Sequence, residues 1–592
     1  MKKIRISKKI LIVLMLGLGI VIGNAESPAR VPELIFRTGD NKGEIRYAWL
    51  ASGISDVFSN CSLLVMQGIH SADEVKTNGS PIVSGIAAHS GIIKGEAGEW
   101  YSAVVSAETD SGTIYSEVRQ VKTKRINEGE YDLRFGVISD VHITANLSHN
   151  PYPTVRRFEK ALDWYNSEDI ETLVINGDIT ERGRQSDWNA FNSSWEAHRG
   201  NLNLIAVMGN HEVMEGDKII TTDRFERYTG RMINAHYVIN SYHFIVISGG
   251  EGDFIDQGAV GGAIATGRTE IPGHLDNGNN VSPSVRAWLR TRIDIAKEDA
   301  PGKPIFIFLH WPVSNTFHRS TGGTTSFGNN PLTGFFKDDP EVVIFGGHIH
   351  APNNDPRYIW QGSFTSINVP TLFYFTLENG YLGGDASGTA NNNHPKIAGI
   401  ISRNGAGQGM IVSVKSSIVT IENFDFDFSY EPQPLDSVVQ IPQIWKFDIS
   451  RPEDFPYTNA IRNEQKTAPI FDESKPANES LDGIIIKSIT DTSVEIEFPQ
   501  AMIPLPNLNN EVVHSYRFDF INRQTGVIDR SAKQYSDFML HPRLRRPTYT
   551  QLIGGLTPGT DYELRIYAYG SFQECSGQYL ICTFETLASS VE

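Results

Sequence analysis

The sequence has little cysteine and, beyond its first residues, no long apolar run. Three cysteines in 592 residues exclude a disulfide-rich scaffold. Cys575 and Cys582 could pair in an oxidising compartment, but one extended strand would hold them too far apart, so a bridge requires a loop that turns back between them. No stretch after residue 22 is long and apolar enough to cross a membrane.

Positive charge is also in deficit, with 52 Lys and Arg against 69 Asp and Glu and a formal net charge of −17. A surface this acidic repels phosphate backbones, which argues against a nucleic-acid partner. The hydrophobic share of 40% and the charged share of 20% are typical of a soluble globular protein. A chain of this length exceeds one hydrophobic core and indicates three or four domains.

The first residues differ from the rest of the chain. Five cations precede an apolar run from Ile10 to Ile22, and small residues follow up to Ala25. This pattern predicts a secretory signal peptide at residues 1–25, cleaved after Ala25, and hence a secreted or extracytoplasmic protein. The alternative is an uncleaved anchor, for which the apolar run is shorter than the ~20 residues of a membrane span.

Short apolar runs at 134–139, 172–176, 204–208, 305–309 and 342–345 each end in polar residues. Runs of this length, bounded by Gly or polar positions, predict buried strands. Ligands of α/β sheets gather at the carboxyl ends of the strands, so we expect these polar side chains along one edge of one sheet. The polar segments are Asp140-Val-His142, Gly177-Asp178, Gly209-Asn210-His211-Glu212, His310 and Gly347-His348-Ile349-His350.

Two Asp, one Asn and five His in these segments suit two borderline-hard cations that share a bridging carboxylate. Taken singly, His310 would more often be a satisfied polar residue at a strand end, and Asp178 an ordinary turn carboxylate. Five such segments in a fixed order favour a metal centre over coincidence.

The order D-x-H, G-D, G-N-H-[DE], a lone His and G-H-x-H resembles the calcineurin-like metallophosphoesterases. The resemblance implies an α/β fold, a four-layer α-β-β-α sandwich, with two metal ions that could be manganese, iron or zinc. It implies that Asp178 bridges the metals and that His211 is a catalytic histidine outside the ligand set. The first metal would be held by Asp140, His142, Asp178 and His350, and the second by Asp178, Asn210, His310 and His348.

The implied reaction is hydrolysis of a small phosphate ester, in which a hydroxide shared by the metals attacks phosphorus and His211 protonates the leaving group. The run Gly177–Gly183, followed by Asp187 and Trp188, resembles the cyclic-nucleotide-phosphodiesterase-like branch and favours diesters. Purple acid phosphatases have Gly and Tyr where this chain has His142 and Glu181, so iron–tyrosinate chemistry is not expected. Glu212 would either orient His211 or cap the following segment.

Two other functions remain open at this stage. One is a secreted phosphomonoesterase or nucleotidase that uses the same residues. The other is a surface-binding protein with an inactive phosphoesterase domain, an alternative that the flanking regions motivate.

Alternating strands predict all-β sandwiches at residues 26–126 and 480–592. The C-terminal one resembles a fibronectin type III domain through Leu556–Ala568, with Tyr562 as the corner tyrosine. The N-terminal one resembles the same fold more faintly through Trp100–Ala107, and an unrelated β-sandwich is the alternative. We expect these domains to contact a cell surface or polymer.

The catalytic domain is predicted at residues 127–430, followed by a linker at 431–479. Helical spacing of apolar residues begins near Val155, Trp188 and Val285. A glycine-rich segment, 249–281, is predicted to be a long loop beside the metals, either a wall of the substrate site or a surface insertion. Residues 127–478 alone are expected to hydrolyse small esters.

Overall fold

The computed structural model describes residues 33–589 with gaps at 40, 51–59, 85–88, 110–111, 126–128, 146–153, 215–217, 248–282, 322–331, 379–380, 383–406 and 429–434. The predicted signal peptide and the glycine-rich loop at 249–281 lie outside the described residues. The chain divides into two compact units, Met1–Arg125 and Ile126–Glu592.

The first unit is a sandwich of two antiparallel sheets. Its buried core includes Leu34, Ile45, Leu63 and Val105, which alternate with outward-facing residues along the strands. One sheet has the order β1 (Glu33–Thr38), β2 (Glu44–Leu50) and β5 (His89–Lys94). The other contains β4 (Ser80–Ser84), β3 (Cys61–Gln67), β6 (Trp100–Thr109), β7 (Gly112–Tyr115) and β8 (Arg119–Lys122), with helix α1 at Ala72–Asn78.

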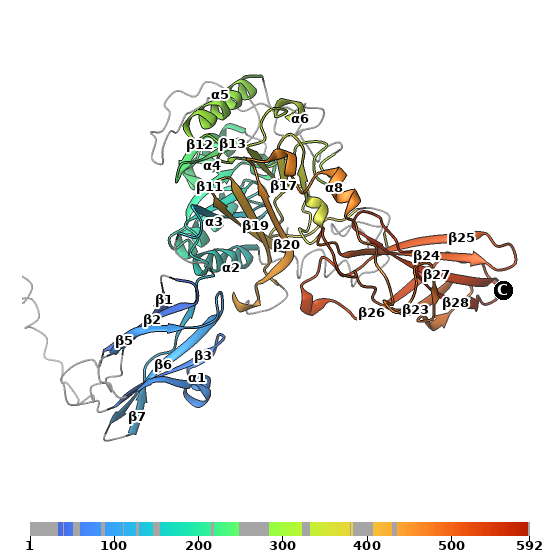
Figure 1. Cartoon of the computed structure of the whole chain (residues 1–592), viewed down its shortest axis with the longest axis horizontal. Helices are drawn as coiled ribbons and strands as arrows, with labels where there is room; N and C mark the ends of the chain where they lie inside the picture. Colours follow the sequence, from blue (N-terminus) through green and yellow to red (C-terminus); the bar gives the residue numbers. More distant parts are fainter. Residues whose placement is uncertain are drawn as a thin grey trace, which may run out of the picture. The chain divides into compact units, whose positions relative to one another are not determined.

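Two six-stranded sheets form the centre of the second unit (Figure 1). The first has the order β11 (Asn203–Val207), β10 (Thr172–Asn176), β9 (Leu133–Ile138), β18 (Gln408–Lys415), β19 (Ile418–Asp425) and β20 (Val439–Asp448). The second has the order β12 (Asn234–Ile239), β13 (Tyr242–Ile247), β14 (Ile305–Leu309), β15 (Val342–Gly346), β17 (Thr365–Asn368) and β16 (Ile359–Gln361).

The two sheets pack face to face through aromatic side chains. The ring of Phe135 on β9 lies 4.9 Å from Phe244 and 5.1 Å from Phe306, both at edge-on angles. Every residue of β10 and β14 is buried, because these strands have neighbours on both faces.

Helices cover the outer faces of the sheets, as the apolar spacing predicted. Trp164 of α2 packs against Phe424 of β19 at 4.6 Å, and Phe158 of α2 stacks on Phe191 of α3 at 5.6 Å. Leu289 of α5 is fully buried in the same outer core. The helices are α2 (Thr154–Ser167), α3 (Gln185–His198), α4 (Lys218–Thr229), α5 (Pro283–Asp299) and the short α6 (Leu332–Phe335). The four-layer α-β-β-α prediction is confirmed.

Two expectations about this domain are wrong. The strands that carry the motifs do not share one sheet: β9, β10 and β11 belong to the first, and β14 and β15 to the second. An apolar run cannot reveal which of two buried sheets it joins. The second wrong expectation is that residues 431–479 are a linker. They contain β20, which belongs to the first sheet, and helix α8 (Asn459–Glu464). Arg462 of α8 is buried, and its guanidinium donates to the carbonyls of Ile359 and Pro356.

The C-terminal region is a second two-sheet sandwich. The Tyr562 hydroxyl accepts the N–H of Thr557 at 3.1 Å, so the predicted corner is present. One sheet has the order β21 (Ser480–Leu481), β28 (Tyr579–Glu585), β27 (Asp561–Gly570), β24 (Val513–Asn522) and β25 (Ile528–Tyr535). The other has β22 (Ile485–Ile489), β23 (Ser493–Pro499) and β26 (Thr548–Gly554).

The three cysteines are free thiols, so Cys575 and Cys582 form no bridge in this structure. Among the described residues, no helix is both long and apolar enough to span a membrane.

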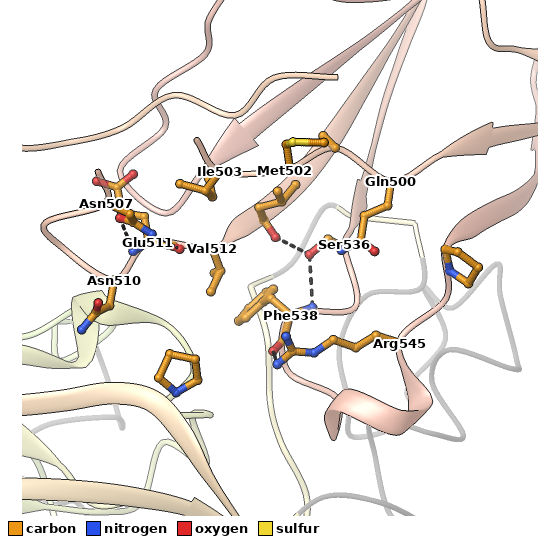
Figure 2. A pocket seen from close by; sticks show the side chains of 14 residues that line it. Gln500, Met502, Ile503, Asn507, Asn510, Glu511, Val512, Ser536, Phe538 and Arg545 are labelled. Atoms are coloured by element: carbon orange, nitrogen blue, oxygen red, sulfur yellow. Dashed lines mark hydrogen bonds between the residues drawn. The ribbon is translucent and has the colours of Figure 1, made fainter. Parts of the chain in front are cut away.

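A cavity of about 600 Å³ lies where the C-terminal sandwich meets β20 (Figure 2). Pro442 of β20 lines it together with sandwich residues such as Met502, Ile503, Glu511 and Phe538. Its lining includes none of the motif residues.

Strand β20 supplies a test of the corrected domain boundary. Trp445 is 2% exposed and packs in the core between the sheets, whereas its neighbour Ile444 is 42% exposed. We expect Trp445→Ala to lower the free energy of unfolding of this domain by about 3–5 kcal/mol, and Ile444→Ala by about 0.5 kcal/mol. Denaturant unfolding followed by far-UV circular dichroism measures both. Equal, small effects would support the linker interpretation.

Candidate metal centre

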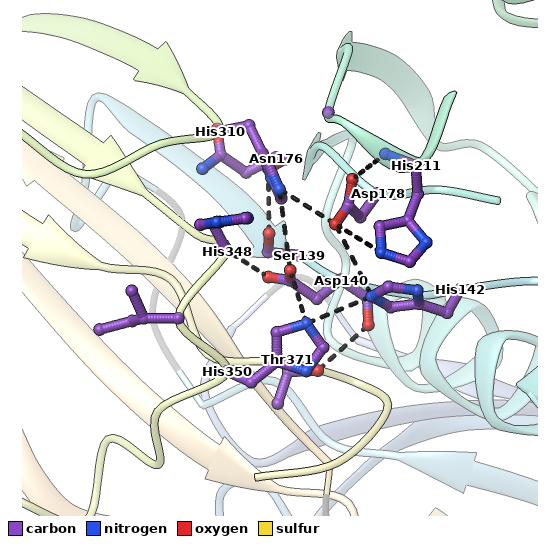
Figure 3. Close-up of polar contacts among 12 residues, drawn as sticks. Ser139, Asp140, His142, Asn176, Asp178, His211, His310, His348, His350 and Thr371 are labelled. Carbon is purple, nitrogen blue, oxygen red and sulfur yellow. Dashed lines mark hydrogen bonds and ion pairs between the residues drawn. The ribbon is translucent and has the colours of Figure 1, made fainter. Parts of the chain in front are cut away.

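The motif residues follow the carboxyl ends of β9, β10, β11, β14 and β15, and these ends meet where the two sheets adjoin. Figure 3 shows the side chains converging from both sheets. His310, which follows β14 in the second sheet, places Nε2 at 3.1 Å from Oδ2 of Asp178, which follows β10 in the first. The site is therefore a junction between sheets rather than the edge of one.

The backbone at the site is strained. Five non-glycine residues have a positive φ: Asp140 (51°), His142 (53°), Asp178 (49°), His348 (69°) and His350 (49°). Such conformations cost on the order of 1–3 kcal/mol each and persist where the surrounding structure fixes them. Here the loops are tied to one another, since Asp140 N donates to Gly177 O at 3.0 Å and His142 N to Asp178 O at 2.9 Å.

One group of donors consists of Asp140, His142, Asp178 and His350, whose ligand atoms all lie within 4.8 Å of one another. Nε2 of His350 is 3.0 Å from Oδ1 of Asp140 and 3.2 Å from Nε2 of His142. All four residues are buried.

A second group consists of Asp178, His310 and His348, again with ligand atoms within 4.8 Å. The Oδ1 atom of Asn210 is buried in the described structure and has no hydrogen-bond partner there. Asp178 belongs to both groups, so its carboxylate could bridge two cations.

The orientation of the imidazoles fits metal ions. Nδ1 of His142 faces Glu181 Oε2 at 3.0 Å, Nδ1 of His350 faces the Tyr374 carbonyl at 3.1 Å, and Nδ1 of His310 faces the Asn176 carbonyl at 2.9 Å. Each acceptor requires a proton on Nδ1, so the neutral rings direct an Nε2 lone pair at their neighbours. Facing lone pairs and carboxylates repel unless a cation or a proton lies between them, and these residues could therefore hold metal ions.

Electrostatics at the site agree with this reasoning. Burial alone would raise the pKa of Asp178, but His310 and His211 hold that pKa well below its usual range. Burial opposes protonation of His310, yet Asp178 raises the pKa of His310 to about 9. In the absence of a cation a proton therefore takes the place between His310 and Asp178.

His211 lies beside both groups of donors. Its Nδ1 faces the carbonyl of Glu181 at 2.6 Å, and its backbone N–H donates to Asp178 Oδ1 at 2.9 Å. Its Nε2 is 3.9 Å from Oδ2 of Asp178, and its ring meets the His142 ring edge-on at 4.3 Å. The ring nitrogen directed at the centre is thus Nε2. Nitrogens of His211 and His142 also lie within 4.8 Å of a Glu181 oxygen.

Glu212 takes a different role from the two considered. It is fully buried and accepts the N–H of Thr180 and that of Gly209, each at 2.8 Å. These bonds join the loop after β10 to the loop after β11. Burial, with Asp178 nearby, raises the pKa of the Glu212 carboxyl to about 7.

Residues 133–352 match the family model of the calcineurin-like phosphoesterases. No curated protein matches the chain in sequence. Among solved structures, the chain is similar to a purple acid phosphatase from yellow lupin seeds (11% identity, 71% of this chain and 74% of that chain, TM-score 0.31). It is also similar to PhoD (9% identity, 70% and 88%, TM-score 0.31) and to the FN5 domain of Drosophila Lar (13% identity, 19% and 99%, TM-score 0.13).

Residues 133–352 therefore form a calcineurin-like metallophosphoesterase domain. The structure brings seven of the eight residues singled out in the sequence into one cluster. The eighth, Asn210, stands beside His211 in the chain, with its Oδ1 buried. Four partners of the histidines were missed: the Glu181 carboxylate and the carbonyls of Asn176, Tyr374 and Glu181. Glu181 could have been found from its place three residues after Asp178, but a carbonyl partner leaves no signal in the sequence.

The contact between Glu181 and His142 can be tested by metal binding. We expect Glu181→Ala to lower the affinity of the metal-free protein for Mn²⁺ by about 10–100-fold, because His142 loses the acceptor that fixes its tautomer. Glu181→Gln should lose less, since its amide oxygen can still accept from Nδ1. Isothermal titration calorimetry measures both, with Glu196→Ala, a 57% exposed side chain on α3, as control. Wild-type affinity in Glu181→Ala would contradict this role.

Proposed function

We propose that this chain is a secreted phosphoesterase that hydrolyses phosphate esters, with diesters preferred, at a two-metal centre. The observation that carries the proposal is the position of Asp178 in both donor groups, at the junction of the two sheets. Secretion rests on the N-terminal pattern of residues 1–25.

In this proposal, Asp140, His142, Asp178 and His350 hold one metal ion, and Asp178, Asn210, His310 and His348 hold the other. Two bound metal ions would lower the pKa of a water, hold a phosphoryl oxygen and offset charge on the attacking and leaving oxygens. The protein supplies fixed geometry, because the Nδ1 partners of His142, His310 and His350 orient these rings.

His211 would donate a proton to the leaving oxygen. Burial lowers the pKa of His211, but the Asp178 carboxylate and the Glu181 carbonyl raise it above the usual value. The Glu181 carbonyl occupies Nδ1, so the proton that can be transferred is on Nε2, the atom directed at the centre. An alkoxide is a poor leaving group at neutral pH and requires such a donor.

The preference for diesters rests on the resemblance of Gly177–Gly183, Asp187 and Trp188 to the phosphodiesterase-like branch. In this structure several of these residues support the loops. Asp187 accepts from Thr144 Oγ1 and from Ala145 N, each at 3.2 Å, and Thr180 donates to Glu212. These residues therefore hold the loop that carries His142. The proposed preference for diesters is supported by the resemblance alone.

Substrate class can be measured with two synthetic esters. With added Mn²⁺, we expect kcat/KM to be higher for bis-p-nitrophenyl phosphate than for p-nitrophenyl phosphate, because the proposed site accepts a phosphate with two ester groups. The reverse order would indicate a phosphomonoesterase. Absence of hydrolysis of either ester by protein loaded with metal would contradict the proposed function.

The role of His211 can be separated from metal binding. We expect His211→Ala to lower turnover of an alkyl phosphodiester by about 10²–10⁴-fold while both metals stay bound. The loss should be small for a p-nitrophenyl ester, because p-nitrophenolate leaves without a proton. The measurement compares both substrates and determines metal content alongside. Equal losses on the two esters would argue against acid catalysis, and a lost metal would make His211 a ligand.

A further inference from the structure

A segment without any motif, residues 371–378, packs along the metal centre. Thr371 Oγ1 donates to the carbonyl of Asp140 at 3.1 Å, and Leu372 N donates to the carbonyl of Ser139 at 3.1 Å. The Phe373 ring lies 5.0 Å from the His142 ring. The segment thereby supports the loop after β9, which carries two of the proposed ligands.

The same segment makes several contacts with His350. Nδ1 of His350 donates to the Tyr374 carbonyl at 3.1 Å, and the two rings lie 4.4 Å apart. Thr376 N donates to the carbonyl of His350 at 2.9 Å, and Thr376 Oγ1 donates to that of Ile349 at 2.5 Å. His350 has a positive φ, so these bonds hold it in a conformation that it would otherwise leave.

The far end of the segment is held by the C-terminal sandwich. The hydroxyl of Tyr535, on β25, lies 2.6 Å from Oε2 of Glu378 and 2.9 Å from the carbonyl of Glu378. The rings of Tyr381 and Tyr535 stack at 4.0 Å, and Leu382 N donates to the carbonyl of Lys533 at 2.5 Å. Phe375 and Leu377 are buried in one apolar cluster with Tyr535, Phe538, Met539 and Leu540.

Ion pairs of the central domain hold Glu378 from the other side. Its Oε1 is 2.5 Å from Nε2 of His318 and 3.2 Å from a guanidinium nitrogen of Arg357. Arg357 is also paired with the buried Asp355 at 2.6 Å and contacts His514 of the sandwich at 3.0 Å. The Glu378 carboxylate thus joins the two domains at one point, two residues from the N–H that contacts His350.

We infer that the C-terminal sandwich is a positioning element of the metal centre, with Tyr535 and Glu378 as positioning residues that fix His350 through residues 371–378. This inference rests on the proposed assignment of His350 as a metal ligand. It revises the expectation that residues 127–478 would be sufficient for hydrolysis, because that piece lacks the partner of Glu378.

The test uses the full-length chain with the substitutions Tyr535→Phe and Glu378→Gln. Both substitutions nearly keep the side-chain volume. Tyr535→Phe removes the hydroxyl that donates to Glu378, and Glu378→Gln removes the charge that faces His318 and Arg357. In calorimetric titrations of the metal-free protein with Mn²⁺, we expect one of the two binding events to weaken by about tenfold, while the other stays at wild-type affinity. Hydrogen exchange of peptides that cover 371–378 should become faster in the same metal-free variants.

Tyr516→Phe is the matched control. Tyr516 is a buried tyrosine of the same sandwich whose hydroxyl accepts Ala501 N at 2.9 Å. The Tyr516→Phe variant shows whether a general loss of sandwich stability affects metal binding. Because none of the hydrogen bonds and ring contacts described for Tyr516 involves residues 371–378, we expect both Mn²⁺ affinities and the hydrogen exchange of 371–378 to stay unchanged. Equal effects of Tyr516→Phe and Tyr535→Phe would overturn the inference, and so would wild-type affinities in both Tyr535→Phe and Glu378→Gln.

If Tyr535→Phe does not fold, Glu378→Gln decides the outcome alone. The readouts are independent of hydrolysis. A wild-type protein that binds two Mn²⁺ ions without cleaving an ester would refute the proposed function and leave the inference standing. A wild-type enzyme that cleaves esters, with variants of unchanged affinity, would refute the inference alone.

Discussion

The Asp178 carboxylate is the constraint on which the rest of this domain depends. One of its oxygens lies 3.1 Å from His310 of the second sheet and 3.8 Å from His142 of the first. A carboxylate can serve both donor groups only if the ends of the two sheets are held together at this point. The aromatic packing of Phe135 against Phe244 and Phe306 provides that fixed distance.

Several local features of this centre are energetically unfavourable. Five site residues have left-handed backbones, and the carboxylates of Asp140 and Asp178 are buried. The remaining structure offsets these features through bonds that act on the loops rather than on a substrate. Glu212 joins two loops, and Asp187 joins α3 to the loop that follows His142. A bound cation would compensate the buried negative charge in the way that a proton on His310 does in its absence.

The sequence predicted those parts of the site whose residues lie close together in the chain, and it missed contacts between residues far apart in the chain. Each ligand candidate stands directly after a buried strand, so an apolar run and its polar end identify it locally. Strand β20 was missed because Pro442 and exposed residues such as Ile444 interrupt the apolar pattern of a strand buried on one face. Tyr535 and Glu378 are 157 residues apart, and neither belongs to a recognisable motif. Contacts between distant residues of ordinary type leave no signal in one sequence.

The contact at Glu378 also bears on what a flanking β domain does. A domain that only attached the chain to a surface would need no ion pair of this kind at its boundary, because desolvating Arg357 and Asp355 is unfavourable unless the geometry is fixed. Here Asp355 is buried and the Arg357 side chain is only 11% exposed, and His514 of the sandwich contacts Arg357 at 3.0 Å. A boundary of this kind tolerates little relative motion, since displacement would leave charges buried without partners. The hydrogen bonds from Tyr535 to Glu378 therefore link the sandwich to residues 371–378, and in the proposed arrangement the orientation of His350 depends on both.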